Sequence, residues 1–292
     1  MLKVQRITCC LLVILLAFGA GAAAEDAAAA VRSINHRGYN SIAPENTLPA
    51  YRLSKEKGFE YVETDISFTR DGIPVLLHDS SINRTARNAD GSEIAETVEI
   101  GSITYEEALA YDFGIWKGEE YGGTKIPTFD EFLQCCIELG LHPYLELKEN
   151  GDYTENQIQA LVSLVEGKGL RGQVTWISFQ PNYLEWVRDR DPEARLGLLV
   201  MVWFTEDGFD GLVRKAAALR TGKNDVFMDA SYWTMHLLPD GMKQCVSVCR
   251  KASMPLEVWT VNDENALRSL DPYISGVTSD TLQYASFRQE KP

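Results

Sequence analysis

Positive charge is scarce in this sequence. Its 292 residues include 28 Lys and Arg against 42 Asp and Glu, which gives a formal net charge of −14. A protein that binds nucleic acid needs a basic face to meet the phosphates, so this balance argues against nucleic acid as a partner. Hydrophobic residues at 45 % and charged residues at 24 % are ordinary for a globular protein, and they exclude a disordered chain or a coiled coil.

The sequence also lacks an apolar run of the ~20 residues that a membrane-spanning helix needs. Lys3 and Arg6 precede a shorter apolar run over residues 7–18, and small residues follow as far as Ala24. This pattern is typical of a secretory signal peptide with an A-x-A cleavage site. We therefore expect a signal peptide over residues 1–24, a flexible leader over 25–31, and a secreted or periplasmic mature protein without a stable membrane anchor. An uncleaved anchor is the alternative.

Few cysteines remain after that segment: Cys135, Cys136, Cys245 and Cys249. A secreted domain with a large apolar core does not need disulfides for its stability. We expect these four side chains to be small buried hydrophobes on helices.

Short apolar or β-branched runs alternate with helix-like stretches along residues 32–292, which we expect to form a single domain. Such alternation predicts a parallel sheet, and eight repeats favour a closed (β/α)8 barrel over an open doubly wound sheet. No glycine-rich phosphate loop follows the first run, which weakens the doubly wound alternative further. The expected strands are Arg32–His36, Tyr61–Ser67, Pro143–Leu147, Val174–Phe179, Arg195–Val200, Asp225–Asp229, Leu256–Val261 and Gly276–Ser279.

One segment interrupts the alternation after the second expected strand. Asp71-Gly72 is a strong signal for a two-residue hairpin turn, and a loop made of these two residues would pair Asp65 with His78. The following stretch, from about residue 80 to 127, is too long for a plain loop. We expect it to form a small cap beside the active end of the barrel.

Charged residues lie on strands that should be buried and apolar. Glu63 and Asp65 are two apart and therefore share one face of their strand, as do Glu146 and Lys148 on theirs. The intervening Leu145 and Leu147 should face the helices, which points the charges into the barrel near its carboxyl-terminal mouth. One lysine cannot neutralise three carboxylates, so we expect Glu63, Asp65 and Glu146 to bind a hard divalent cation.

Two histidines belong to the same end of the barrel. His36 closes the first expected strand and His78 ends the hairpin, and such a pair can act as general base and general acid. Arg37 and Lys148 add fixed positive charge beside them. Positive groups around two histidines suit an anion whose charge must be stabilised during transfer, and a phosphate ester fits best.

Together these motifs resemble the glycerophosphodiester phosphodiesterase family in residue type, order and spacing, over nearly all of residues 33–284. The matching segments are His36-Arg-Gly38, Pro44-Glu-Asn-Thr47, Glu63-x-Asp65, Thr69-Arg-Asp-Gly72, His78-Asp79, Arg84-Thr85, Ile126-Pro-Thr-Phe-Asp-Glu131, Glu146-x-Lys148, Ser178-Phe179, Trp259-Thr-Val-Asn262 and Gly276-Val-Thr-Ser-Asp280.

The resemblance implies a distorted (β/α)8 barrel, one divalent cation (calcium or magnesium), and hydrolysis of small-molecule glycerophosphodiesters to glycerol 3-phosphate and an alcohol. By position it implies metal ligands at Glu63, Asp65 and Glu146 and an acid–base pair at His36 and His78. It further implies phosphate contacts from Arg37 and Lys148, an aromatic Trp259 near the glycerol, and a supporting Glu45 that orients His36 or the metal ligands.

Three alternatives stay open at this point. The substrate could be a lysophospholipid, with aromatic residues of the expected cap lining a groove for its acyl chain, or a teichoic-acid-type glycerophosphate polymer. Thirdly, the chain could be an inactive binding module on the same barrel, although every candidate metal ligand and both histidines are present.

Overall fold

The computed structural model describes residues 31–148, 152–202, 208–237 and 239–284. The expected signal peptide and all but the last residue of the expected leader lie outside these described residues, so they stay predictions.

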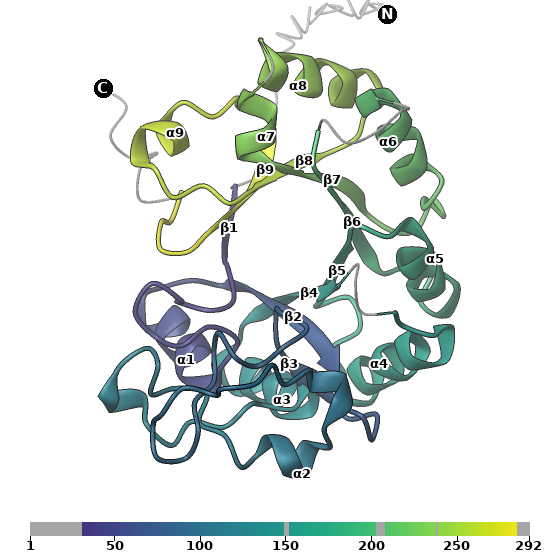
Figure 1. The fold of residues 1–292 in the computed structure, drawn as a ribbon. Helices are drawn as coiled ribbons and strands as arrows, with labels where there is room; N and C mark the ends of the chain where they lie inside the picture. Colours follow the sequence, from purple (N-terminus) through teal and green to yellow (C-terminus); the bar gives the residue numbers. More distant parts are fainter. Residues whose placement is uncertain (1–30, 149–151, 203–207, 238, 285–292) are drawn as a thin grey trace, which may run out of the picture.

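Eight parallel strands close into a barrel, as the alternation predicts (Figure 1). Neighbours pair in the order β1-β9-β8-β7-β6-β5-β4-β2, and a further pairing between β1 and β2 closes the ring. The strands are β1 (Arg32–Asn35), β2 (Tyr61–Phe68), β4 (His142–Leu147), β5 (Thr175–Ser178), β6 (Arg195–Val200), β7 (Val226–Ser231), β8 (Leu256–Trp259) and β9 (Ile274–Ser279). All eight expected strands are therefore present, within two residues at most ends.

Helices surround the strands on the outside (Figure 1). They are α1 (Leu48–Glu56), α3 (Phe129–Leu139), α4 (Glu155–Gly167), α5 (Pro181–Arg190), α6 (Gly208–Ala217), α7 (Tyr232–His236), α8 (Gly241–Lys251) and α9 (Glu264–Arg268). Capping boxes at Thr128 and Thr154 begin α3 and α4, because each hydroxyl accepts a hydrogen bond from the backbone N–H three residues on. Within the described residues, no helix has the length and apolar character that crossing a bilayer requires.

The main hydrophobic core lies between the strands and these helices. Leu145 and Leu147 belong to it, as expected from their alternation with Glu146. The four cysteines are buried and unpaired on α3 and α8, in agreement with their expected role as small hydrophobes.

A second layer of side chains fills the barrel interior: Ile34, Tyr144, Ile177, Leu199 and Phe227. Below it lies Glu257 of β8, which is 1 % exposed. Its carboxylate accepts hydrogen bonds from Arg195 at 2.7 Å and from the Tyr144 hydroxyl at 3.1 Å. The amino-terminal end of the barrel is therefore closed by a paired buried charge.

The hairpin after β2 differs from its expected register. Strand β3 (Pro74–Leu76) pairs antiparallel with β2 so that Ile66 lies opposite Leu76. The backbone carbonyl of Asp65 accepts a hydrogen bond from the N–H of Leu77, so Asp65 does not lie opposite His78. The predicted two-residue turn is wrong because the loop has three residues between Thr69 and Ile73. The Thr69 hydroxyl donates to Asp71, and Gly72 takes the left-handed conformation (φ +79°) that closes such a loop.

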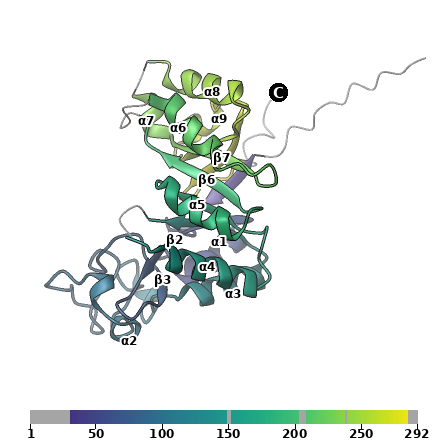
Figure 2. The same ribbon diagram turned by 90° about the vertical axis from the view of Figure 1, so that its right-hand side faces the viewer.

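The segment from residue 80 to 127 contains three short helical pieces: η1 (Ile100–Ser102), α2 (Tyr105–Ala108) and η2 (Glu119–Tyr121). It lies beside β3 and projects from the rest of the barrel (Figure 2). Its apolar side chains form a separate cluster with those of β3, including Ile82, Ile100 and Phe113. The segment is therefore packed on its own small core next to the hairpin.

Candidate active site

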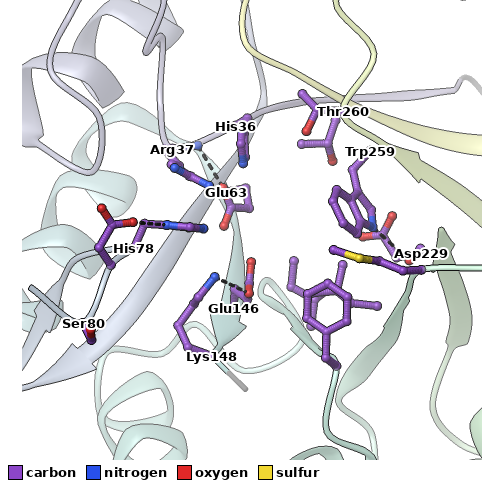
Figure 3. Close-up of a pocket in the computed structure, with 16 residues that line it drawn as sticks. His36, Arg37, Glu63, His78, Ser80, Glu146, Lys148, Asp229, Trp259 and Thr260 are labelled. Carbon is purple, nitrogen blue, oxygen red and sulfur yellow. Dashed lines mark hydrogen bonds and ion pairs between the residues drawn. The ribbon is translucent and has the colours of Figure 1, made fainter. Parts of the chain in front are cut away.

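A cavity of about 600 Å³ opens at the carboxyl ends of the strands. Figure 3 shows charged groups on one side of it and Trp259 with Asp229 on the other. Seven of the nine residues singled out in the sequence line it: His36, Arg37, Glu63, His78, Glu146, Lys148 and Trp259. The other two lie behind this lining, where Asp65 is fully buried and Glu45 contacts Arg37.

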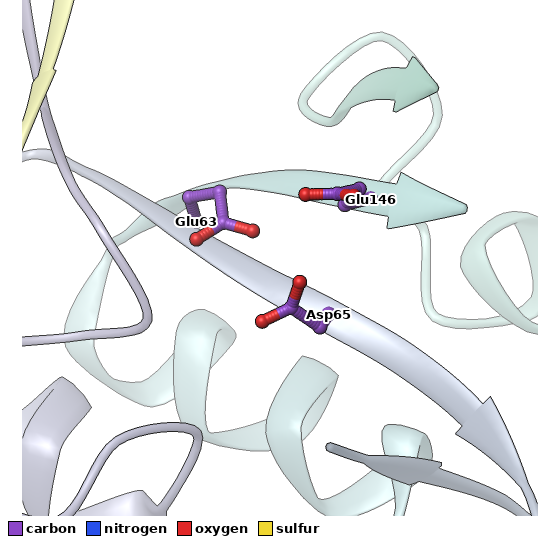
Figure 4. A group of neighbouring side chains, drawn as sticks. All are labelled: Glu63, Asp65 and Glu146. Carbon is purple, nitrogen blue, oxygen red and sulfur yellow. The ribbon is translucent and has the colours of Figure 1, made fainter. Parts of the chain in front are cut away.

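Three carboxylates converge at the base of the charged side (Figure 4). Asp65 of β2 lies opposite Glu146 of β4 in the strand register, and Glu63 lies two residues before Asp65 on the same face. Each offers one oxygen, and these three atoms lie within 4.8 Å of one another. The pairing of β2 with β4 therefore creates the cluster that the sequence predicts.

Two cations partly neutralise this cluster. The Lys148 ammonium donates to Glu146 at 2.8 Å and lies 3.2 Å from an Asp65 oxygen. Arg37 donates its backbone N–H to Glu63 at 2.9 Å, and its Nε lies 3.3 Å from Asp65. Three negative charges thus face two positive ones.

Burial and this uneven balance of charge together set the pKa values of the three carboxyl groups. Burial raises the pKa of Glu63 well above its usual range, and the Asp65 and Glu146 carboxylates raise it further. Burial and Asp65 likewise raise the pKa of Glu146. Burial alone would also raise the pKa of Asp65, but the charges of Lys148 and Arg37 hold it below its usual range.

These residues fit a divalent cation. The Oε1 atom of Glu63 is buried without a hydrogen-bond partner in the described residues, and a buried unpaired carboxylate oxygen is costly. Oxygen ligands lie about 2.3–2.6 Å from Ca²⁺, so two ligands of one ion can be up to about 5 Å apart. The spacing and chemistry of Glu63, Asp65 and Glu146 could therefore hold such an ion.

Each candidate catalytic histidine contacts a carboxylate through Nδ1. His36 pairs with Asp280, which follows β9, at 2.8 Å, and His78 pairs with the adjacent Asp79 at 2.7 Å. Burial alone would raise the pKa of Asp280, but hydrogen bonding and charge from His36 bring it to about 2. A carboxylate at Nδ1 holds a proton on that nitrogen, which leaves Nε2 free to accept one.

Glu45 contacts arginines rather than His36. Its carboxylate accepts hydrogen bonds from Arg37 at 2.9 Å and from Arg84, in the segment over residues 80–127, at 2.8 Å. Arg84 also donates to Asp79 at 2.6 Å. Gly38, which follows Arg37, packs closely against Ala50. A Cβ at this position would lie 2.7 Å from the Cβ of Ala50, so a side chain does not fit there. Glu45 thereby connects Arg37, through Arg84, to Asp79, which is the partner of His78.

The opposite side of the cavity is apolar except for Asp229. Trp259 at the end of β8 packs edge-on against Phe179, with ring centroids 5.7 Å apart. The indole N–H of Trp259 donates to the backbone carbonyl of Asp229 at 3.0 Å, which fixes the ring in place. A short carbon chain attached to a phosphate could pack against this wall.

Several residues of the site have no role in the sequence analysis. Asp79 and Asp280 stand in matching motifs without an assigned function, and so does Asn46, whose amide donates to Asp65 at 2.8 Å. Asp79 follows a histidine directly, which is a readable signal. Asp229 is an acid on a buried strand, and the criterion that identified Glu63 would have identified it too.

The sequence profile of the glycerophosphoryl diester phosphodiesterase family matches residues 36–283. A glycerophosphodiester phosphodiesterase of Caldanaerobacter subterraneus is 26 % identical over 248 residues, which are 85 % of this chain and 93 % of that protein. Glycerophosphodiester phosphodiesterase 1 of mouse is 28 % identical over 211 residues, which are 70 % of this chain and 60 % of the mouse protein.

Solved structures share the fold. A glycerophosphodiester phosphodiesterase from Thermotoga maritima superposes with a TM-score of 0.64 at 22 % identity, covering 89 % of this chain and 98 % of the other. A phosphodiesterase from Oleispira antarctica, in complex with the product sn-glycerol-3-phosphate, superposes with a TM-score of 0.68 at 23 % identity and covers 88 % and 95 %.

Proposed function

Since this chain belongs to the glycerophosphoryl diester phosphodiesterase family, we propose that it hydrolyses glycerophosphodiesters to glycerol 3-phosphate and an alcohol with the help of a divalent cation. Family membership makes it a phosphoric diester hydrolase. The observation that carries the proposal is the placement of two histidines beside three buried carboxylates in one cavity.

The cation would be calcium or magnesium, held by Glu63, Asp65 and Glu146. When bound there, it supplies positive charge that stabilises the negative charge of the phosphoryl oxygens in the transition state. Arg37 and Lys148 line the same cavity and add fixed positive charge toward the phosphate.

The histidines move the protons. The glycerol 2-hydroxyl attacks phosphorus, and Nε2 of one histidine takes the hydroxyl proton as the new P–O bond forms. The other histidine protonates the oxygen of the alcohol as its P–O bond breaks, which leaves a cyclic glycerol phosphate. Water then opens this ring with the proton transfers reversed. Asp280 and Asp79 keep His36 and His78 oriented for these transfers through Nδ1.

The proposal is tested with glycerophosphocholine as substrate. We expect the protein to release glycerol 3-phosphate, as measured with a coupled glycerol-3-phosphate dehydrogenase assay, and EDTA to abolish the release. Added Ca²⁺ or Mg²⁺ in excess of the chelator should restore it. Full activity in a chelated, metal-free sample would refute the cation's role, and absence of hydrolysis under all conditions would refute the substrate class.

We also propose export with removal of residues 1–24, which is supported by the basic start, the apolar run and the small residues before Glu25. The mass of the mature protein from its native host would test this, because retention of the apolar segment contradicts cleavage.

A further inference from the structure

One buried carboxyl group in the cavity has no role in the proposed reaction. Asp229 lies on β7, is 1 % exposed and lines the cavity beside Trp259 (Figure 3). Its Oδ1 atom is buried and has no hydrogen-bond partner among the described residues. A buried polar group without a partner is costly, so such an atom in a ligand cavity points to a ligand group that pairs with it.

Among the residues that the structure describes, the surroundings of Asp229 supply no alternative partner. Its register neighbours are Leu199 on β6 and Glu257 on β8. Leu199 is apolar, and the Glu257 carboxylate is already paired with Arg195, Arg32 and Tyr144. Phe227, two residues earlier on the same face of β7, belongs to the apolar layer of the barrel interior, so the open direction is the cavity itself.

The chemistry of the site favours a neutral hydroxyl as that partner. Burial and the Glu257 carboxylate raise the pKa of Asp229 well above its usual range. An ammonium group would pair only with the ionised carboxylate, whereas a hydroxyl can donate to the ionised form or accept from the protonated form. A hydroxyl is therefore matched to Asp229 in either state.

The glycerol half of the substrate is the part that carries hydroxyls in every case. The alcohol on the other side of the phosphate differs from one glycerophosphodiester to another, so a fixed buried group is best matched by the constant half. The 2-hydroxyl of that half is used in the proposed attack on phosphorus, which leaves the terminal one.

We propose that Asp229 is a specificity-determining residue that forms a hydrogen bond with the terminal hydroxyl of the substrate glycerol. This inference rests on the proposed function. It follows that the enzyme requires this hydroxyl to be free and discriminates against lysophospholipids whose terminal oxygen carries an acyl chain.

The test compares kcat/KM for glycerophosphocholine with that for its analogue in which the terminal hydroxyl is replaced by hydrogen. For the wild type we expect the analogue to be poorer by about 10-fold or more, the size of one lost buried hydrogen bond. In Asp229→Ala the two substrates should become nearly equal, because the pairing partner is gone. Asp229→Asn keeps an acceptor oxygen and should retain part of the preference. Asp210→Ala, the same substitution at an exposed carboxylate of α6 outside the cavity, is the matched control and should retain all of it.

Other outcomes overturn the inference. The proposed hydrogen bond is refuted if the ratio of kcat/KM for the two substrates is the same in Asp229→Ala as in the wild type, while circular dichroism shows that both proteins are folded. A change in the choline-to-ethanolamine preference in Asp229→Ala would place Asp229 on the leaving-group side. Lysophosphatidylcholine hydrolysis by the wild type as fast as glycerophosphocholine hydrolysis also refutes the requirement. If the wild type does not hydrolyse glycerophosphocholine at all, the proposed function has failed instead.

Discussion

Replacing Glu63 by Gln distinguishes two effects of its charge in the buried carboxylate cluster. One is repulsion from Asp65 and Glu146 in the metal-free protein, and the other is attraction to a bound cation. In the metal-free protein, three carboxylates face two cations, and the pKa of Glu63 is raised by burial and by Asp65 and Glu146. The substitution mimics the protonated side chain and keeps an oxygen that can accept from the Arg37 N–H. We therefore expect Glu63→Gln to be as stable as the wild type in EDTA, or slightly more stable.

When a cation is present, we expect Glu63→Gln to be less stable than the wild type instead. A ligand at 100 times its dissociation constant stabilises the folded state by about 2.7 kcal/mol. In a domain of this size, 1 kcal/mol changes the Tm by about 2–4 °C. Saturating Ca²⁺ or Mg²⁺ should therefore raise the Tm of the wild type by about 5–10 °C, and that of Glu63→Gln by much less because one ligand charge is lost.

Differential scanning fluorimetry at fixed ionic strength measures the Tm of each protein in EDTA and with the saturating cation. Glu106→Gln is the matched control, since Glu106 is exposed on α2 and its loss should leave the cation-induced shift unchanged. The reasoning is refuted if Glu63→Gln lowers the Tm in EDTA by several degrees, or if the variant and the wild type gain equally from the cation.

Three further predictions concern charged and catalytic groups elsewhere in the barrel. His36→Ala and His78→Ala should each lower kcat by on the order of 10²-fold or more, the usual contribution of general acid–base catalysis, and near-wild-type rates in both would exclude their proposed roles. Asp280→Asn should lower kcat by about 10-fold or more and alter the pH–rate profile, because His36 loses the carboxylate at Nδ1. The pKa of Asp280 is about 2, below the ~3.9 of an unfolded Asp, so its stabilisation is present above about pH 4 and is lost as the pH falls towards 2. Acid unfolding followed by circular dichroism should accordingly be less steep in this range for Asp280→Asn. Glu257→Gln should destabilise the protein by about 2 kcal/mol in urea unfolding, because Arg195 and Arg32 lose a shared buried carboxylate and Arg195 keeps only its ion pair with Asp225. The folded fraction of this variant should keep the wild-type kcat.

The strands and the polar face of the barrel were predictable from the sequence because both depend on local periodicity. Glu63, Asp65 and Glu146 alternate with apolar residues on strands that should be buried, so their common direction follows from the pleat. The two capping boxes were readable for the same reason, since each is complete within four residues.

Contacts between distant or competing groups were not predictable in this way. The hairpin register was wrong by one residue because the contact between Thr69 and Asp71 favours a three-residue loop, and turn signals alone do not reveal it. The pairing of His36 with Asp280 joins residues 244 positions apart, and only the closure of the barrel brings them together.

On the proposed mechanism, that pairing makes activity depend on the last strand of the barrel. His36 lies near the start of the barrel and Asp280 follows β9, the last strand, which pairs with β1. A nascent or truncated chain without β9 can neither close the ring nor hold His36 in orientation, even though every candidate metal ligand has already been synthesised. On the proposed mechanism, the hydrolase therefore becomes active only when its final strand is in place, and we expect fragments that lack this strand to be inactive.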